Sequence, residues 1–333
     1  LLKRIDIFNN KINSLPPLPN GLEILHCASN RISTLPTLPA SLLTLNCGNN
    51  LLTSIPVLPP SLQQLICDGN KNIASLPTLP FSLEKLHCQD NKITTLPSLP
   101  SLLELKCSKN LITSIPFLPQ TLRILWCANN QLTSLPTLPV SLRDFDCSTN
   151  QITSLSAFPA GLNKLVCFKN KLTSLATLPP ALQFLSCYEN QIPSLSAFPN
   201  TLQQVYCQNN RIMSLSVLSS SLTELNCSYN ELTSIPALPP SLQKLYCNHN
   251  QLTSLPALPP SMNTLWCNNN PLLSCLPAIP GGLTSLNRAV TSIACIPNPN
   301  SFGNSFGLTL CTSNSLCETA ASNSGIVFLD KNT

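Results

Sequence analysis

The sequence predicts a β solenoid, in which short coils stack with a parallel β-sheet on the concave side and polyproline-like or irregular backbone on the convex side, with little or no helix. Three observations predict this fold. The pattern L-x-x-L-x-C-x-x-N-x-L-T-S-L-P-x-L-P recurs about every twenty residues from residue 1 to roughly residue 280, and a fixed period of this length indicates stacked repeats. Apolar residues alternate in the first part of the pattern, and prolines interrupt the last part.

The L-x-x-L-x-C part of each repeat predicts a short strand with one buried face. Apolar residues fall at alternate positions near its end, as they do along a half-buried strand. Stacked copies would form a parallel sheet with about 4.7–4.9 Å between neighbouring strands. The residues between the apolar positions would then face outward on the concave side.

The L-P-x-L-P part of the repeat excludes an α-helix on the convex side. Its two prolines lie three residues apart. Each proline removes a backbone donor and clashes with the preceding turn of a helix, and a residue before proline prefers an extended conformation. We therefore expect polyproline-like or irregular backbone there.

One asparagine in each repeat predicts a buried ladder of amides. The series is Asn10, Asn30, Asn50, Asn70, Asn91, Asn110, Asn130, Asn150, Asn170, Asn190, Asn210, Asn230, Asn250 and Asn270. The register gains a residue near Lys71 and Asn72 and loses one near Ser101. We expect each side chain to turn inward and bond backbone groups of its own and the neighbouring coil, because buried polar groups need partners.

Thirteen of the seventeen cysteines share one position of the repeat and predict buried free thiols. They are Cys27, Cys47, Cys67, Cys88, Cys107, Cys127, Cys147, Cys167, Cys187, Cys207, Cys227, Cys247 and Cys267. Ile7 holds this position in the first repeat, so a small apolar side chain suits it. Structural zinc sites usually contain close pairs such as C-x2-C, which these cysteines do not form. Side chains in register point the same way, which opposes disulfides between adjacent coils.

The remaining four cysteines lie near the C-terminal end. Cys275 and Cys295 replace the serine that precedes Leu-Pro or Ile-Pro in most repeats, which places them on neighbouring coils, and Cys311 and Cys317 follow. A solenoid must cover its last apolar coil, so we favour the disulfides Cys275–Cys295 and Cys311–Cys317, while other pairings stay open. Either bridge would indicate an oxidising compartment.

The repeat resembles the leucine-rich repeat family, in its short bacterial form with L-P-x-L-P on the convex side. The resemblance covers residues 1–296, about fourteen repeats and a degenerate last one. Residues 297–324 are rich in Asn, Ser, Pro and Gly and are interpreted as cap loops.

The segment 325–333 reads Gly-Ile-Val-Phe-Leu-Asp-Lys-Asn-Thr. It resembles the opening strand of the B-type β-sandwich repeats of bacterial surface adhesins, which begin G-x-V-F-x-D-x-N. The resemblance implies that a following β domain starts here and that Asp330 and Asn332 begin a calcium-binding loop; the alternative is a terminal strand or tail. No other cofactor or metal is expected. Because the chain opens inside a repeat and stops within this pattern, we expect a piece of a longer multidomain protein.

Aromatic residues provide the candidate binding site. The residue before each cysteine varies from repeat to repeat, as expected of a face that packing does not constrain. Both tryptophans occupy this position, and aromatic residues cluster mostly in the later half among Asn, Gln and Ser. Such a surface can stack on sugar rings or anchor a protein loop, although single exposed aromatic residues are common. The candidate ligand-binding residues are Trp126, Phe168, Phe184, Tyr188, Tyr206, Tyr229, Tyr246 and Trp266.

The sequence does not predict an enzyme. His26 and His87 would lie three coils apart, about 15 Å by strand spacing, which is too far for a shared metal or a proton relay. No glycine-rich phosphate loop occurs. Charged residues make up 9% of the chain and the net charge is +5, without a basic run typical of nucleic-acid binding. No apolar run is long enough for a transmembrane segment.

We therefore predict a non-catalytic, protein- or glycan-binding module of a bacterial cell-surface or secreted adhesin, joined to further domains of the same polypeptide. Two alternatives stay open. The repeat also resembles the substrate-recognition domain of secreted bacterial effector ubiquitin ligases, whose enzymatic domain would lie outside this chain. A mostly uncharged face rich in Asn, Gln and Ser would also suit a rigid spacer.

Overall fold

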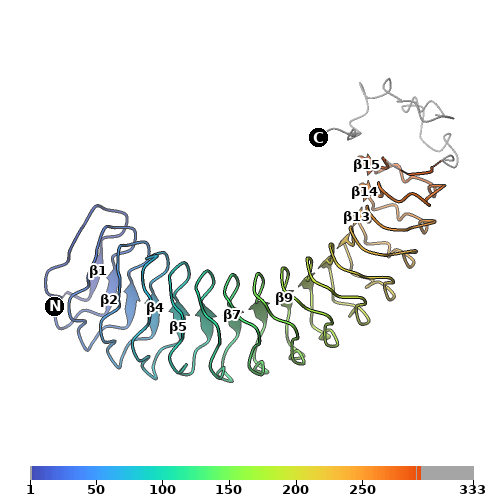
Figure 1. Ribbon diagram of the computed structural model, residues 1–333. Helices are drawn as coiled ribbons and strands as arrows, with labels where there is room; N and C mark the ends of the chain where they lie inside the picture. Colours follow the sequence, from blue (N-terminus) through green and yellow to red (C-terminus); the bar gives the residue numbers. More distant parts are fainter. Residues whose placement is uncertain (1, 290, 294–333) are drawn as a thin grey trace. The chain divides into compact units, whose positions relative to one another are not determined.

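The structure is a computed structural model that describes residues 2–289 and 291–293, and it confirms the predicted β solenoid (Figure 1). The described residues contain fifteen short strands and no helix, and thus no helix that could cross a membrane. The coils form two compact units, Leu1–Lys171 and Leu172–Thr333. We call them unit 1 and unit 2 and describe each by itself.

Each coil contributes one strand of three residues. The strands of unit 1 are β1 (Arg4–Asp6), β2 (Ile24–His26), β3 (Thr44–Asn46), β4 (Gln64–Ile66), β5 (Lys85–His87), β6 (Glu104–Lys106), β7 (Ile124–Trp126), β8 (Asp144–Asp146) and β9 (Lys164–Val166). The strands of unit 2 are β10 (Phe184–Ser186), β11 (Gln204–Tyr206), β12 (Glu224–Asn226), β13 (Lys244–Tyr246), β14 (Thr264–Trp266) and β15 (Ser285–Asn287). Within each unit, consecutive strands pair in parallel and in sequence order.

The alternation of the strand residues separates the core from the surface. The middle residue of each strand points inward; Leu25, Leu45 and Phe145, for example, are fully buried. The first and third residues point outward, because successive side chains of a strand lie on opposite faces. We call the outward side of the sheet the strand face.

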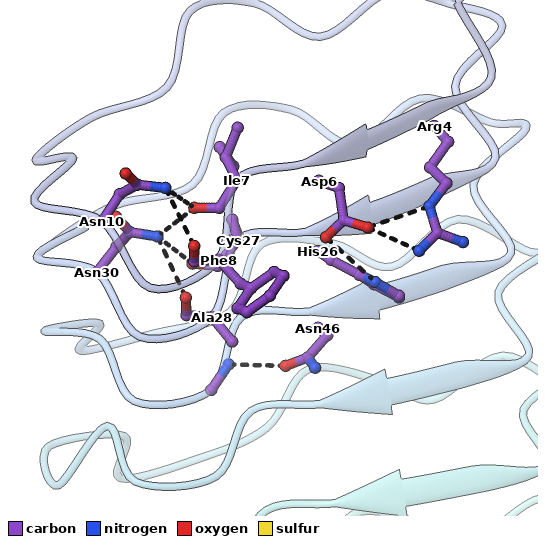
Figure 2. A network of polar contacts seen from close by, with 11 residues as sticks. Arg4, Asp6, Ile7, Phe8, Asn10, His26, Cys27, Ala28, Asn30 and Asn46 are labelled. Atoms are coloured by element: carbon purple, nitrogen blue, oxygen red, sulfur yellow. Dashed lines mark hydrogen bonds and ion pairs between the residues drawn. The ribbon is translucent and has the colours of Figure 1, made fainter.

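The asparagine ladder forms as the sequence predicts. Asn30 Nδ2 donates to the carbonyl of Cys27 in its own coil (3.0 Å) and to that of Ile7 in the preceding coil (2.8 Å), while its Oδ1 accepts from the Ile12 amide (3.0 Å). Figure 2 shows Asn10 and Asn30 reaching these carbonyls. The same three bonds are present at Asn270, whereas Asn91 keeps the two bonds to cysteine carbonyls and its Oδ1 has no partner. The donor bonds of these amides tie neighbouring coils together.

The thirteen repeat cysteines are buried thiols. Burial raises their pKa values, to about 11 for Cys27 and about 12 for Cys107. The Cys67 thiol donates to the carbonyl of His87 in the next coil (3.4 Å). These cysteines therefore behave as small apolar side chains, as predicted. Cys275 is not among them; Cys295, Cys311 and Cys317 lie outside the described residues, as do 297–324, Asp330 and Asn332.

The segments that lead from each ladder asparagine back to the next strand, which we call the return segments, contain no charged residue. This holds for residues 12–21, 32–41 and the corresponding stretch of every later coil up to 252–261. Their prolines exclude helix, as the sequence predicts, and side chains such as Phe81 (95% exposed) and Phe117 (89% exposed) project into solvent. The charges of the repeats therefore lie on the strands and on the turns beside them.

Candidate functional site

The strand face differs in chemistry between the two units. In unit 1, its ionisable residues are Arg4, Asp6, His26, Lys85, His87, Glu104, Lys106, Asp144, Asp146 and Lys164. In β10–β15 of unit 2, the acidic and basic residues are Glu224 and Lys244. The other outward positions hold aromatic, amide or hydroxyl side chains. The strand faces of the two units therefore differ in charge and in aromatic content.

Ion pairs lie at two places on the strand face of unit 1. Near its first strands, Arg4 Nη2 lies 2.7 Å from Asp6 Oδ2, and His26 Nδ1 lies 3.7 Å from Asp6 Oδ1 (Figure 2). Further along, Glu104 Oε1 lies 3.0 Å from His87 Nε2 and 2.5 Å from Lys106 Nζ. Burial alone would raise the pKa of Glu104, but the Lys106 hydrogen bond and the nearby His87 outweigh it and lower that pKa.

Trp126 lies within this charged surface. Lys106 Nζ lies 4.2 Å and Lys164 Nζ 5.8 Å from the centre of its ring, distances at which a cation is attracted to the face of an indole. In the neighbouring coil, Asp146 Oδ1 accepts hydrogen bonds from the amide (2.9 Å) and hydroxyl (2.6 Å) of Ser148. Burial nevertheless raises the pKa of Asp146. The protein's own lysines thus occupy the surroundings of this tryptophan.

Two aromatic pairs dominate the strand face of unit 2. The rings of Phe184 and Tyr206 lie 5.6 Å apart and are tilted by 44°. The rings of Tyr246 and Trp266 lie 5.2 Å apart, edge to face at 85°. Such geometries are favourable between aromatic rings, so the two rings of each pair hold one another in place.

Two of these aromatic residues, Trp266 and Tyr206, have their polar ends engaged within the protein. Trp266 Nε1 donates to Ser285 Oγ (3.1 Å). Burial, together with the charge of Glu224 and a hydrogen bond to it, raises the pKa of Tyr206 to about 12. Glu224 Oε2 also lies 3.3 Å from Lys244 Nζ. The Tyr206 hydroxyl and the Trp266 indole N–H are therefore already engaged within the protein.

A third aromatic contact lies on the turns that follow the strands. Tyr229 and His249 stack with ring centres 4.0 Å apart and planes 12° apart, and His249 Nε2 lies 2.9 Å from Asn269 Nδ2. These three residues directly precede ladder asparagines and have φ of 52°, 54° and 52°, a left-handed conformation that favours Asn or Gly over bulky residues. Burial lowers the pKa of His249.

The structure separates the eight predicted binding residues into groups. It brings Phe184 to Tyr206 and Tyr246 to Trp266 in unit 2, and it places Trp126 among charges in unit 1. Phe168 and Tyr188 each directly follow one of the repeat cysteines and are half-buried. Tyr229 belongs to a turn and contacts His249 instead of the strand-face aromatic pairs.

Sequence reasoning missed the ion-pair cluster of Glu104, His87 and Lys106. A signal was present, because the first outward residue of each strand, two positions before the residue that precedes cysteine, also varies without a repeat. Comparing both outward positions across neighbouring coils would have placed these opposite charges side by side.

Comparisons with known proteins agree with this architecture. The family profile described as Leucine Rich repeats (2 copies) matches residues 82–120, 220–259 and 240–281. No curated protein matches the sequence.

Several solved structures share the fold. YopM from Yersinia enterocolitica WA-314 is 33% identical over 90% of this chain and 71% of its own, with a TM-score of 0.79. YopM from Yersinia pestis, described as a leucine-rich effector protein, is 31% identical over 90% of this chain and 86% of its own, with a TM-score of 0.79. The functional domain of InlJ from Listeria monocytogenes, described as including a cysteine ladder, is 25% identical over 88% of this chain and 64% of its own, with a TM-score of 0.69.

Proposed function

The chain belongs to the bacterial leucine-rich repeat proteins, and from that premise we propose that it is a non-catalytic recognition module whose ligand binds on the strand face of unit 2. The observation that carries this proposal is the presence of two preformed aromatic pairs, Phe184–Tyr206 and Tyr246–Trp266, at outward strand positions. Aromatic side chains of this kind supply most of the energy of many binding surfaces.

Packing of the coils does not require these aromatic residues. The core is built from the inward Leu and Cys residues and the ladder Asn, such as Leu225, Cys227 and Asn230. At the same outward strand positions, other coils of the solenoid hold Asn46 or Ile66. The aromatic pairs are therefore dispensable for the fold, which supports a role in binding.

The test of this site replaces three of its aromatic residues together. We expect Tyr206→Ala/Tyr246→Ala/Trp266→Ala to lose the binding that the unchanged chain shows on arrays of extracellular proteins and glycans. Trp126→Ala, which removes a tryptophan from the equivalent position of unit 1, is the matched control and should keep that binding. Equal array signals from the triple variant and the unchanged chain would exclude this surface as the site.

We further propose that the parent protein is a secreted or cell-surface adhesin. The resemblance of residues 325–333 to an adhesin B-type repeat supports this role. The likeness to YopM favours the second candidate, a secreted effector. The reading frame beyond residue 333 distinguishes them: β-sandwich repeats, with Asp330 and Asn332 beginning a calcium loop, fit an adhesin, whereas a helical domain with a nucleophilic cysteine fits an effector.

The terminal cysteines provide a second test of an oxidising location. We propose the bridges Cys275–Cys295 and Cys311–Cys317. A thiol count on the unfolded chain, without reductant, should then give thirteen reactive thiols out of seventeen cysteines. A count of seventeen would exclude both bridges and would remove this support for an extracellular protein.

A further inference from the structure

We propose that the ligand of unit 2 is an uncharged oligosaccharide that runs across strands β10–β14. This inference rests on the proposed function, which places the binding site on the same strand face. It adds the chemical class of the ligand, for which three features of the surface argue: its charge, the arrangement of its rings and its remaining polar groups.

The strand face of unit 2 is nearly without net charge. Glu224 and Lys244 neutralise one another at 3.3 Å, and Glu224 is also engaged by Tyr206. A carboxylate, phosphate or ammonium group brought onto this surface would lose water without gaining an unpaired counter-charge, which is unfavourable. The surface therefore selects ligands without ionised groups.

The aromatic pairs form two apolar platforms along the sheet. Phe184 and Tyr206 stand on β10 and β11, Tyr246 and Trp266 stand on β13 and β14, and Asn226 of β12 lies between the two platforms. Four strand steps span about 19 Å, which suits a short oligosaccharide better than a single sugar. Sugar rings have apolar C–H faces that pack on aromatic rings. The polar ends of Tyr206 and Trp266 are already bonded within the protein.

The outward positions around the rings hold groups that match sugar hydroxyls. Gln204, Asn226 and Thr264 provide uncharged donors and acceptors. A small number of placed polar groups around apolar surface is typical of sites for small molecules, in which the polar groups fix orientation. A neutral sugar chain uses both the ring faces and these amides, whereas the return segments offer apolar and hydroxyl groups without paired aromatic platforms.

The two tryptophans allow a direct measurement, because they occupy equivalent positions in different units. Trp126→Phe leaves Trp266 as the fluorophore, and Trp266→Phe leaves Trp126. We would titrate each variant with uncharged hexasaccharides of glucose and of N-acetylglucosamine, with a sialylated oligosaccharide and a heparin fragment as charged probes. We expect saturable quenching by an uncharged probe in Trp126→Phe, no change in Trp266→Phe, and little dependence on salt.

Substitutions around the platforms sharpen this test. Tyr246→Ala in the Trp126→Phe background should weaken binding of the uncharged probe about tenfold, a factor equivalent to about 1.4 kcal/mol. Gln251→Ala in the same background, at an exposed position outside the strand face, is the matched control and should leave the affinity within about twofold. Circular dichroism and an unchanged urea midpoint would establish that each variant is folded.

Two outcomes overturn the inference in different ways. If the charged probes bind more tightly than the uncharged ones and lose affinity with salt, or if an array protein binds through the same aromatic residues while no sugar does, the ligand class is wrong but the site stands. If removing the aromatic residues leaves all array binding unchanged, the proposed function itself is wrong.

Discussion

Trp126 and Trp266 occupy the same position of the repeat in different units, yet they have opposite surroundings. Lys106 and Lys164 flank the ring of Trp126, whereas Trp266 packs against Tyr246 and donates to Ser285. The backbone and the inward residues of the two coils are nearly the same. The comparison teaches that the inward residues determine the coil, and that the outward residues of neighbouring coils determine the chemistry of each stretch of surface.

The ladder asparagines provide the largest expected effect, and it should be equal in both units. Asn110→Ala and Asn250→Ala each remove an amide that bonds two cysteine carbonyls and one backbone amide of the preceding coil. Leaving such buried groups unsatisfied costs about 1–3 kcal/mol for each group. We therefore expect a loss of roughly 3 kcal/mol or more in the free energy of unfolding, measured by urea denaturation.

The controls for this prediction are Gln131→Ala and Gln251→Ala, at exposed positions next to ladder asparagines in units 1 and 2. They should change stability by less than about 0.5 kcal/mol. A large loss of stability for one ladder asparagine and a small loss for the other would show that the ladder does not stabilise the coils of each unit to the same extent.

The buried thiols should make both units sensitive to alkaline pH. Burial raises the pKa of Cys107 in unit 1 and of Cys207 in unit 2 to about 12, whereas thiols of the unfolded chain ionise near pH 8.5. The folded state keeps its thiols neutral, so their contribution to stability is complete below that pH and is lost as the pH rises. The urea midpoint should therefore fall between about pH 8 and about pH 10.5.

Variants of the cysteines isolate this effect. Cys107→Val and Cys207→Val should each weaken the alkaline loss of stability, because each removes one ionisable thiol. The variants should fold, since the position accepts an aliphatic residue, as Ile7 demonstrates in the first coil. An alkaline loss of the same size in both variants and the unchanged chain would mean that other groups cause it.

The ion pairs provide the smallest effect and should distinguish the units. Glu104→Gln removes the partner of both His87 and Lys106 in unit 1, and we expect it to cost about 1 kcal/mol near neutral pH. The lowered pKa of Glu104 means that this contribution is present above the pKa of the unfolded chain and is lost as the pH falls through the folded value.

Glu224→Gln in unit 2 is the comparison for this variant, and it should cost less because Lys244 is more exposed than Lys106. High salt should reduce the difference between the two variants. Equal costs that do not change with salt would contradict the view that electrostatics matters more on the strand face of unit 1.

The sequence was sufficient for the positions that repeat. Ladder residues such as Asn110, repeat cysteines such as Cys107 and the lack of helix in the described part of the chain all follow from residue types whose environment is the same in every coil. The outward contacts were harder, because the partner of Glu104 or Trp266 lies about twenty residues away in a neighbouring coil. Tyr229 shows a second reason. It lies on the turn after β12, at positive φ, and not on the strand face that its aromatic character suggested.

The central claim is that the aromatic residues of unit 2 serve binding and not folding. The most direct test is the urea unfolding of Tyr206→Ala/Tyr246→Ala/Trp266→Ala beside that of Asn250→Ala. We expect a smaller loss of stability for the three aromatic changes together than for the single asparagine change. A larger loss for the aromatic variant would show that the platforms hold the coils together, and would contradict the account.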